Sequence, residues 1–168
     1  SAQAAWHRSA GYGTDSDYAF SVLEYEASPL DRPLKSYRAG ADYAAGSGNR
    51  PVAHSYTANA EGEVRLLGVD AGGNLVISGF YPAGTLARTR MADEDGRLTD
   101  TFTDNMGRTV LERRISGGES LDTYHVPDLQ GNEAWTIGPG GSALLPERGT
   151  WAVPDLTDAN GTTAARFC

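Results

Sequence analysis

Four short acidic turns constrain the fold of this chain more than any other feature of its sequence. Each turn reads Asp-x-x-Gly and is followed directly by Asn or Arg. The second and third copies follow each other closely, the other spacings are about twice as long, and a degenerate fifth copy lies at Asp158 and Gly161. The Asp and Gly positions of the four copies are Asp70 and Gly73, Asp93 and Gly96, Asp104 and Gly107, and Asp128 and Gly131.

The residue types of this motif suit the turn of a β-hairpin. Asp at the first position of a type I turn can accept backbone N–H groups with its carboxylate, and Gly at the fourth can adopt the positive φ of a hairpin bulge. The short spacing from Asp93 to Asp104 corresponds to one strand with its turn, and the longer spacings correspond to two. The motif therefore predicts an all-β fold, a mostly antiparallel sheet of short hairpins.

Short runs of β-forming residues recur around these turns and define the expected domain organisation. Residues 1–17 have neither the period of a strand nor that of a helix, which predicts an irregular extended arm. Residues 18–140 are expected to form the β-hairpin repeat domain. Residues 141–168 are expected to form a loop, or a short helix begun by Asp155 or Asp158, that leads to a further, absent part of a longer parent chain. The expected strands cover residues 18–26, 52–58, 64–69, 75–80, 98–103, 109–115, 122–126 and 134–137.

Charge and hydropathy argue against two classes of partner. The formal net charge is −8 at pH 7 and the basic residues are scattered, so no basic stripe is expected to neutralise the phosphates of nucleic acid. The longest apolar runs, such as Leu75-Val76-Ile77, are far shorter than the ~20 residues of a membrane helix. We therefore expect neither a nucleic-acid partner nor a membrane span.

No group of residues has the spacing of a catalytic, cofactor or metal site. The three histidines, His7, His54 and His125, are far apart, whereas metal motifs place two imidazoles within a few residues. Ser120 lies in the segment Gly118–Asp122, which has Asp122 where the Gly-x-Ser-x-Gly motif of a nucleophile turn has its second glycine. The segment Asp93–Asp95 lacks the third acidic ligand and the closing Glu of a calcium loop. We therefore expect no catalytic residue, no cofactor, no metal ion and no enzymatic activity.

Two other segments have simple structural interpretations. The strand Arg108–Arg114 carries Arg108, Arg113 and Arg114, which are expected to lie on a solvated face; the alternatives are pairing with the acidic residues or contact with a neighbouring section of the parent chain. The segment Gly138–Ser142 has neither the Lys nor the following helical pattern of a phosphate-binding loop, so we expect it to be a plain loop.

Aromatic residues near expected loops give the alternative to a purely structural role. Tyr81, Trp135 and Trp151 have Asp, Asn or Arg residues in their neighbourhood. Aromatic faces combined with polar groups bind sugars by stacking and hydrogen bonding. The alternative is therefore a carbohydrate-binding or adhesive cell-surface module with glycans as partners.

The sequence context of the turns also resembles a known family. The stretch Tyr81–Arg114, with two closely spaced Asp-x-x-Gly-Arg turns before an Arg-Arg strand, resembles the RHS/YD-repeat proteins. It is most similar to the segment that precedes the RHS repeats in large Bacteroidetes surface and secreted proteins. The Tyr-Asp pair that names the YD repeat is absent before all four turns, as in an atypical leading section. Further matching positions are Phe20, Glu24, Ser28–Arg32, Glu63–Leu66, Asp122–Tyr124 and Gly131-Asn132.

This resemblance implies a structural role. In such families a spiralling β-sheet forms a hollow shell that encloses a C-terminal toxin or other variable cargo. The resemblance therefore implies a non-catalytic scaffold segment of an exported protein, located outside the cell or on its surface. Its partners would be other sections of the same parent chain.

Overall fold

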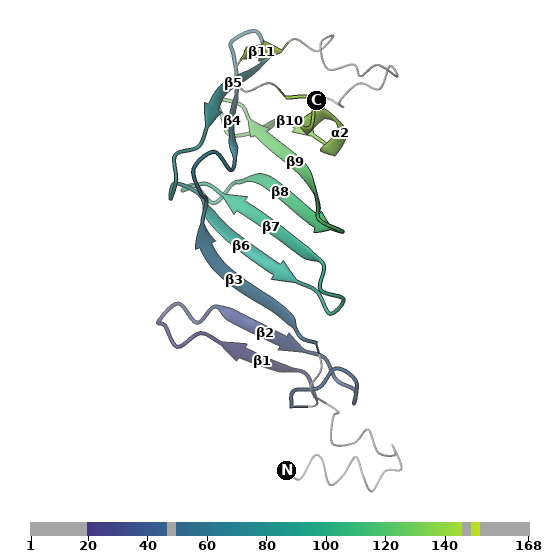
Figure 1. Cartoon of the computed structure of the whole chain (residues 1–168). Helices are drawn as coiled ribbons and strands as arrows, with labels where there is room; N and C mark the ends of the chain where they lie inside the picture. Colours follow the sequence, from purple (N-terminus) through teal and green to yellow (C-terminus); the bar gives the residue numbers. More distant parts are fainter. Residues whose placement is uncertain (1–19, 47–49, 146–148, 152–168) are drawn as a thin grey trace, which may run out of the picture. The chain divides into compact units, whose positions relative to one another are not determined.

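The computed structural model describes residues 20–46, 50–145 and 149–151, which form eleven β-strands and one short helix (Figure 1). The fold is all-β, with antiparallel pairing of short strands, as the turn motif predicts. Within these described residues no helix has the length and apolar character needed to cross a membrane. The expected arm at 1–17, the degenerate turn at Asp158 and the expected helix after Asp155 lie outside the described residues.

The strands form two sheets. The larger sheet has the order β1-β2-β3-β6-β7-β8-β9-β10, and the smaller sheet has the order β11-β5-β4. In the larger sheet the strands are β1 (Val22–Tyr25), β2 (Pro33–Tyr37), β3 (Val52–Ala58), β6 (Ala87–Ala92), β7 (Leu98–Thr103), β8 (Thr109–Ser116), β9 (Glu119–Pro127) and β10 (Glu133–Ile137). In the smaller sheet they are β4 (Arg65–Val69), β5 (Leu75–Phe80) and β11 (Gly149–Trp151).

The chain divides into two compact units. One comprises Ser1–Ser55 and Met91–Leu98, and the other comprises Tyr56–Arg90 and Thr99–Cys168. The second unit contains the hydrophobic core, which is built from inward-facing residues of β5, β7, β8, β9 and β10 together with residues of the connecting segments. Its largest buried apolar side chains are Trp135, Phe102, Leu75, Leu86, Leu111, Ile137, Val64 and Val126.

The four Asp-x-x-Gly motifs join consecutive antiparallel strands and share one hydrogen-bond pattern. At Asp104, the backbone N–H of Gly107 donates to the Asp104 carbonyl at 3.0 Å, which closes the turn. The Asp104 carboxylate Oδ1 accepts the backbone N–H groups of Met106 at 2.9 Å and Arg108 at 3.0 Å. The same bonds recur in the turns that begin at Asp70, Asp93 and Asp128. These carboxylates therefore serve the turns themselves.

The glycines of these turns have the left-handed backbone that the motif predicts. Their φ angles are 82° at Gly73, 79° at Gly96, 80° at Gly107 and 89° at Gly131. A side chain with a Cβ rarely adopts this conformation because the Cβ crowds the neighbouring carbonyl oxygen. The glycines are thus required by the turn geometry.

Three strands were not expected from the sequence. β2 begins with Pro33, and β6 reads Ala-Arg-Thr-Arg-Met-Ala, which lacks the apolar alternation of a half-buried strand. β11 has only three residues and pairs with β5. The β-propensity of these three segments is weak. Each of them forms a strand because pairing with a neighbouring strand outweighs that weak propensity.

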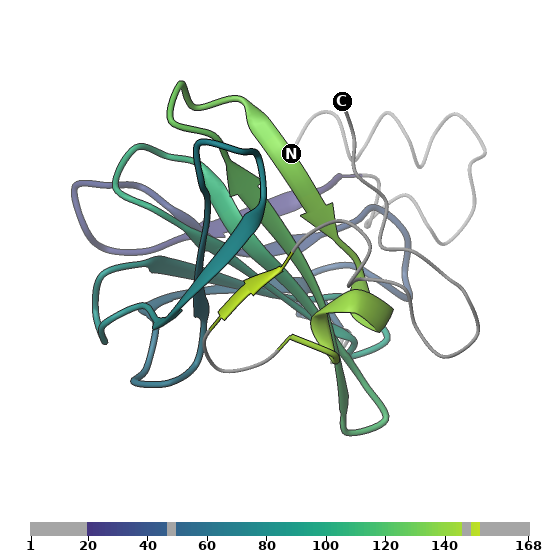
Figure 2. The same cartoon turned by 90° about the horizontal axis from the view of Figure 1, so that it is seen from above.

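The segment Gly138–Ser142 was expected to be a loop, and this prediction is wrong. Pro139–Ser142 forms a single helical turn, α2, with Pro139 in the first turn, where its fixed φ suits a helix. The Ser142 hydroxyl donates to the Pro139 carbonyl at 3.0 Å. Figures 1 and 2 both show α2 directly after β10.

Replacement of Gly107 by Ala should lower the free energy of unfolding by about 1 kcal/mol or more, because the new Cβ must adopt a positive φ. Denaturant unfolding followed by circular dichroism measures the loss. The matched control is Gly68→Ala, since Gly68 lies in β4 with an ordinary φ and open space around the added Cβ. Equal losses in the two variants would contradict the role assigned to the turn.

Candidate functional site

The buried carboxylate of Asp100 on β7 forms ion pairs with two arginines of β6, Arg88 and Arg90. Arg88 and Arg90 are separated by a single position on one strand, so both side chains project from the same face of the sheet. Asp100 has no exposed surface. Its two oxygens accept Nε and Nη2 of Arg90 at 2.6 and 2.7 Å, and Oδ2 also accepts Nη2 of Arg88 at 2.6 Å. Bonds between ionised groups are short and strong, and Arg90 forms the two-point geometry that suits a carboxylate.

A second ion pair lies on the next two strands of the same unit. Arg113 on β8 and Asp122 on β9 are directly opposite each other in the antiparallel register. Arg113 donates through Nε and Nη2 to both oxygens of Asp122, each at 2.7 Å. Only 18% of each side chain is exposed. This pair therefore locks β8 to β9 on the face that carries it.

Glu63 links the two ion pairs. Its Oε1 lies 3.2 Å from Nη1 of Arg88 and 3.6 Å from Nη1 of Arg113. Glu63 precedes β4, and its own carbonyl accepts Nη2 of Arg113 at 3.3 Å. We name these six residues the ionic cluster: Glu63, Arg88, Arg90, Asp100, Arg113 and Asp122.

The ring of Phe102 lies beneath two guanidinium groups of the ionic cluster. The Cζ atoms of Arg88 and Arg113 lie 5.6 and 5.9 Å from the centre of the ring, within the range of cation–π attraction. Phe102 itself is fully buried. The ring thus connects the charged groups above it to the apolar core.

The titration of Asp100 follows from these contacts. Burial disfavours its ionised form, but the hydrogen bonds from Arg90 and Arg88 outweigh burial and hold the pKa of Asp100 below its ordinary value. The bond from Asp122 raises the pKa of Arg113 further above neutrality. The ionic cluster contains three carboxylates and three guanidiniums, so its formal charges balance.

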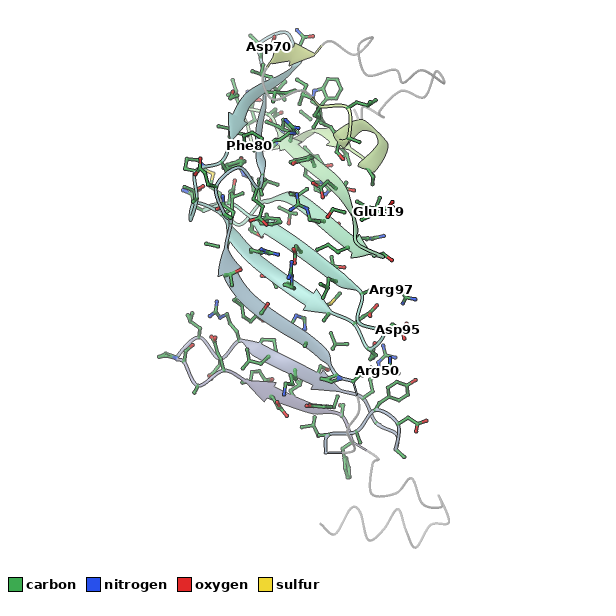
Figure 3. All side chains as sticks on the ribbon, in the orientation of Figure 1. Arg50, Asp70, Phe80, Asp95, Arg97 and Glu119 are labelled. Carbon is green, nitrogen blue, oxygen red and sulfur yellow. The ribbon has the colours of Figure 1, made fainter. Side chains whose placement is uncertain are left out.

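A cavity of about 420 Å³ lies beside the ionic cluster in the same unit. Its charged walls are Glu63, Arg65, Arg113 and Asp122, and its aromatic walls are Phe80 and Tyr124. The hydroxyl side chains of Ser120 and Ser142 complete the polar lining. Figure 3 shows Phe80 at the end of β5.

The three aromatic residues proposed as ligand-stacking groups have different environments. Trp135 is only 1% exposed, and its indole Nε1 donates to the Gly73 carbonyl at 3.1 Å, so its ring packs in the core and leaves no face for a ligand. Tyr81 is partly buried against the core, and burial raises the pKa of its hydroxyl. Trp151 belongs to β11, and its side chain lies outside the described residues.

The carboxylates of the turn that begins at Asp93 pair with the guanidinium of Arg97 in the same turn. Asp93 Oδ1 accepts the backbone N–H groups of Asp95 and Arg97 at 2.9 and 2.8 Å. The guanidinium of Arg97 donates to Asp95 Oδ2 at 2.7 Å, and Figure 3 shows both side chains at this hairpin tip. Among the described residues no group of three or more His, Cys, Asp or Glu side chains is placed to hold a metal ion.

Sequence reasoning missed most of the ionic cluster, and for Arg113 the alternative of pairing with acidic residues was right where the preferred solvated face was wrong. Arg113 was expected on a solvated face, but it is largely buried because Asp122 and Glu63 neutralise it. The alternation of Arg88 and Arg90 was the available signal, since two arginines on one face of a strand require acidic partners when buried. Asn59 was also missed. Asn59 is buried. Its Oδ1 accepts the backbone N–H of Leu86 at 2.8 Å, and its Nδ2 donates to the Pro82 carbonyl at 3.0 Å.

Comparison with known proteins gives a match to the N-terminal part of the chain. Residues 1–58 match a family described as a domain of unknown function, DUF6443. No curated protein and no solved structure matches the chain.

Replacement of Asp100 by Asn should lower the free energy of unfolding by about 3 kcal/mol, because it leaves the two arginines without their buried counter-charge. The pH dependence should change as well. Because the folded pKa of Asp100 is lowered, its contribution to stability is full above the unfolded pKa of about 4 and is lost as the pH falls through the folded pKa. The acid-side loss of stability in the wild type should therefore be steeper than in the variant.

Denaturant unfolding at neutral and acidic pH measures both effects. The matched control is Asp95→Asn, which removes an exposed carboxylate paired with an exposed guanidinium and should cost less than about 1 kcal/mol. Similar losses in Asp100→Asn and Asp95→Asn would contradict a special role for the buried carboxylate.

Proposed function

We propose that this chain is a non-catalytic structural segment of a larger exported protein of the RHS type. In this role it contributes strands to a β-shell that surrounds a C-terminal toxin or other cargo, outside the cell or on its surface. The partners are other sections of the same parent chain. The observation that carries the proposal is the edge strand β1, whose apolar side chains are exposed.

Among the residues that the structure describes, β1 is the first strand of the larger sheet and pairs on one side with β2. Its side chains alternate between the two faces of the sheet. Val22, Leu23 and Tyr25 are 41%, 52% and 53% exposed. An edge strand that exposes unpaired backbone groups and large apolar side chains is a template for pairing with another strand. We infer that a neighbouring section of the parent chain covers this edge.

The loop after β1 is held by charged hydrogen bonds and directs a further apolar side chain outward. Glu26 accepts Nε and Nη2 of Arg32 at 2.7 and 2.8 Å and the Ser28 hydroxyl at 2.6 Å. The hydrogen bonds from Arg32 and Ser28 lower the pKa of Glu26 to about 2, so the carboxylate stays ionised at any ordinary pH. Asp31 has a φ of 45°, and Leu30 beside it is 69% exposed. A preordered loop with an exposed apolar side chain favours binding because little conformational entropy is lost on contact.

Further support comes from the sequence and from the use made of the charged residues. The stretch Tyr81–Arg114 resembles RHS/YD-repeat proteins. The acidic turns and the ionic cluster bind other groups of the same chain. An architectural role accounts for these features without a reaction.

The isolated chain and a longer piece of the parent protein should differ at β1. In the longer protein the amide hydrogens of β1 should exchange more slowly, and Leu23→Lys should lower the melting temperature because it places a charge in a covered interface. In the isolated chain the same substitution should have little effect, because Leu23 is exposed. Hydrogen-exchange mass spectrometry and thermal unfolding measure these outcomes.

Leu129→Lys is the matched control, since Leu129 lies at a hairpin tip and is 89% exposed. It should leave the melting temperature of both proteins unchanged. Equal exchange at β1 in the isolated and longer proteins would contradict the scaffold proposal.

A further inference from the structure

The polar cavity beside the ionic cluster belongs to the second unit, and the scaffold role of β1 does not require it. Its walls come from β4, β5, β8, β9, α2 and the segment before β4. Its volume of about 420 Å³ lies within the range of about 300–1,000 Å³ that is typical of small-ligand sites. The chemistry of its walls indicates which ligand it fits.

The formal charges of the cavity walls balance. Arg113 is paired at two points with Asp122 and lies close to Glu63. The guanidinium of Arg65 lies over the ring of Phe80, with its Cζ 5.4 Å from the ring centre. A ligand with net charge would therefore meet no excess of opposite charge, and its desolvation would be poorly compensated.

The same walls retain hydrogen-bonding capacity for neutral groups. Each Asp122 oxygen has two lone pairs, and the two bonds from Arg113 leave further acceptor sites on them. The Tyr124 hydroxyl accepts the backbone N–H of Arg65 at 3.4 Å, and burial raises its pKa, so it keeps its proton as a donor. The Ser142 hydroxyl donates to Pro139 and keeps its acceptor lone pairs.

We propose that this cavity binds an uncharged polyhydroxyl ligand, a neutral mono- or disaccharide unit. A sugar hydroxyl donates one hydrogen bond and accepts others, which matches a wall of closely spaced carboxylate, guanidinium and hydroxyl groups. The partly buried ring of Phe80 supplies apolar surface for the C–H face of a sugar ring, whereas Tyr124, whose ring is buried in the core, contributes its hydroxyl. The proposed site differs from the Trp135 face suggested by the sequence, which is buried in the core.

Titration of the isotopically labelled protein with neutral sugars tests the proposal. The probes are glucose, galactose, mannose, N-acetylglucosamine, lactose and cellobiose, and the readout is the set of backbone amide shifts in a two-dimensional NMR spectrum. At least one probe should give saturable shifts at residues 120, 124 and 142. Glucuronate and glucosamine, which carry a charge, should bind at least tenfold more weakly than the corresponding neutral sugar.

Two substitutions locate the binding. Ser120→Phe places a large side chain at the cavity wall from an exposed strand position and should weaken binding at least tenfold. Tyr124→Phe removes one hydrogen-bonding hydroxyl and should weaken binding roughly three- to tenfold. The matched control is Ser116→Phe, an exposed position of the same hairpin outside the cavity wall, which should leave binding unchanged. The NMR spectra also report whether each variant is folded.

Three outcomes would overturn the proposal. They are the absence of saturable shifts with every neutral sugar, equal or tighter binding of the charged sugars, and equal weakening by Ser116→Phe and Ser120→Phe. None of them bears on the scaffold role, which depends on the exposed edge of β1 in the other unit.

Discussion

The second unit depends on the ion pairs that the buried Asp100 carboxylate forms with Arg88 and Arg90. An ionised carboxylate without exposed surface is stable only when its charge is neutralised where it lies. Arg90 and Arg88 provide that neutralisation from the adjacent strand at 2.6 to 2.7 Å. Removal of Asp100 leaves both partly buried arginines without this counter-charge. The pairing thereby holds Arg88 and Arg90 on the face of the sheet that carries Asp100, since a register shift by a single position would turn both arginines to the opposite face.

The turns depend on local chemistry and the cluster depends on distant residues, and this difference decides what the sequence could predict. Each Asp-x-x-Gly turn is complete within its own short motif, so its position and its antiparallel hairpin could be predicted from composition and spacing. The strands at 52–58, 75–80 and 98–103 likewise have the expected bounds, because their residues are typical β-formers. Local signals were sufficient wherever the stabilising contacts were also local.

The missed features involve partners far away in sequence. β6 has the composition of a solvated segment, and only Asp100 on β7 and Glu63 before β4 explain why its arginines are partly buried. Arg113 was expected to face solvent for the same reason, because Asp122 becomes its neighbour only through the register of β8 and β9. Trp135 was a possible ligand-stacking residue of the alternative carbohydrate-binding hypothesis, but the Gly73 carbonyl of the β4–β5 turn accepts its indole proton. The cavity could not be inferred from the sequence, since its walls come from segments that are widely separated along the chain, from Gly62 to Ala143.

The two units differ in how the side chains on the faces of their sheets are stabilised. In the second unit charged side chains on one face neutralise one another, and the apolar core that includes Phe102 and Trp135 is buried. In the described part of the first unit, the ion pair between Glu24 on β1 and Lys35 on β2 is exposed. An exposed ion pair contributes little to stability, whereas burial of Val22, Leu23 and Tyr25 would contribute roughly 1 kcal/mol or more for each side chain. Covering these side chains would therefore stabilise the first unit by more than its exposed ion pair does.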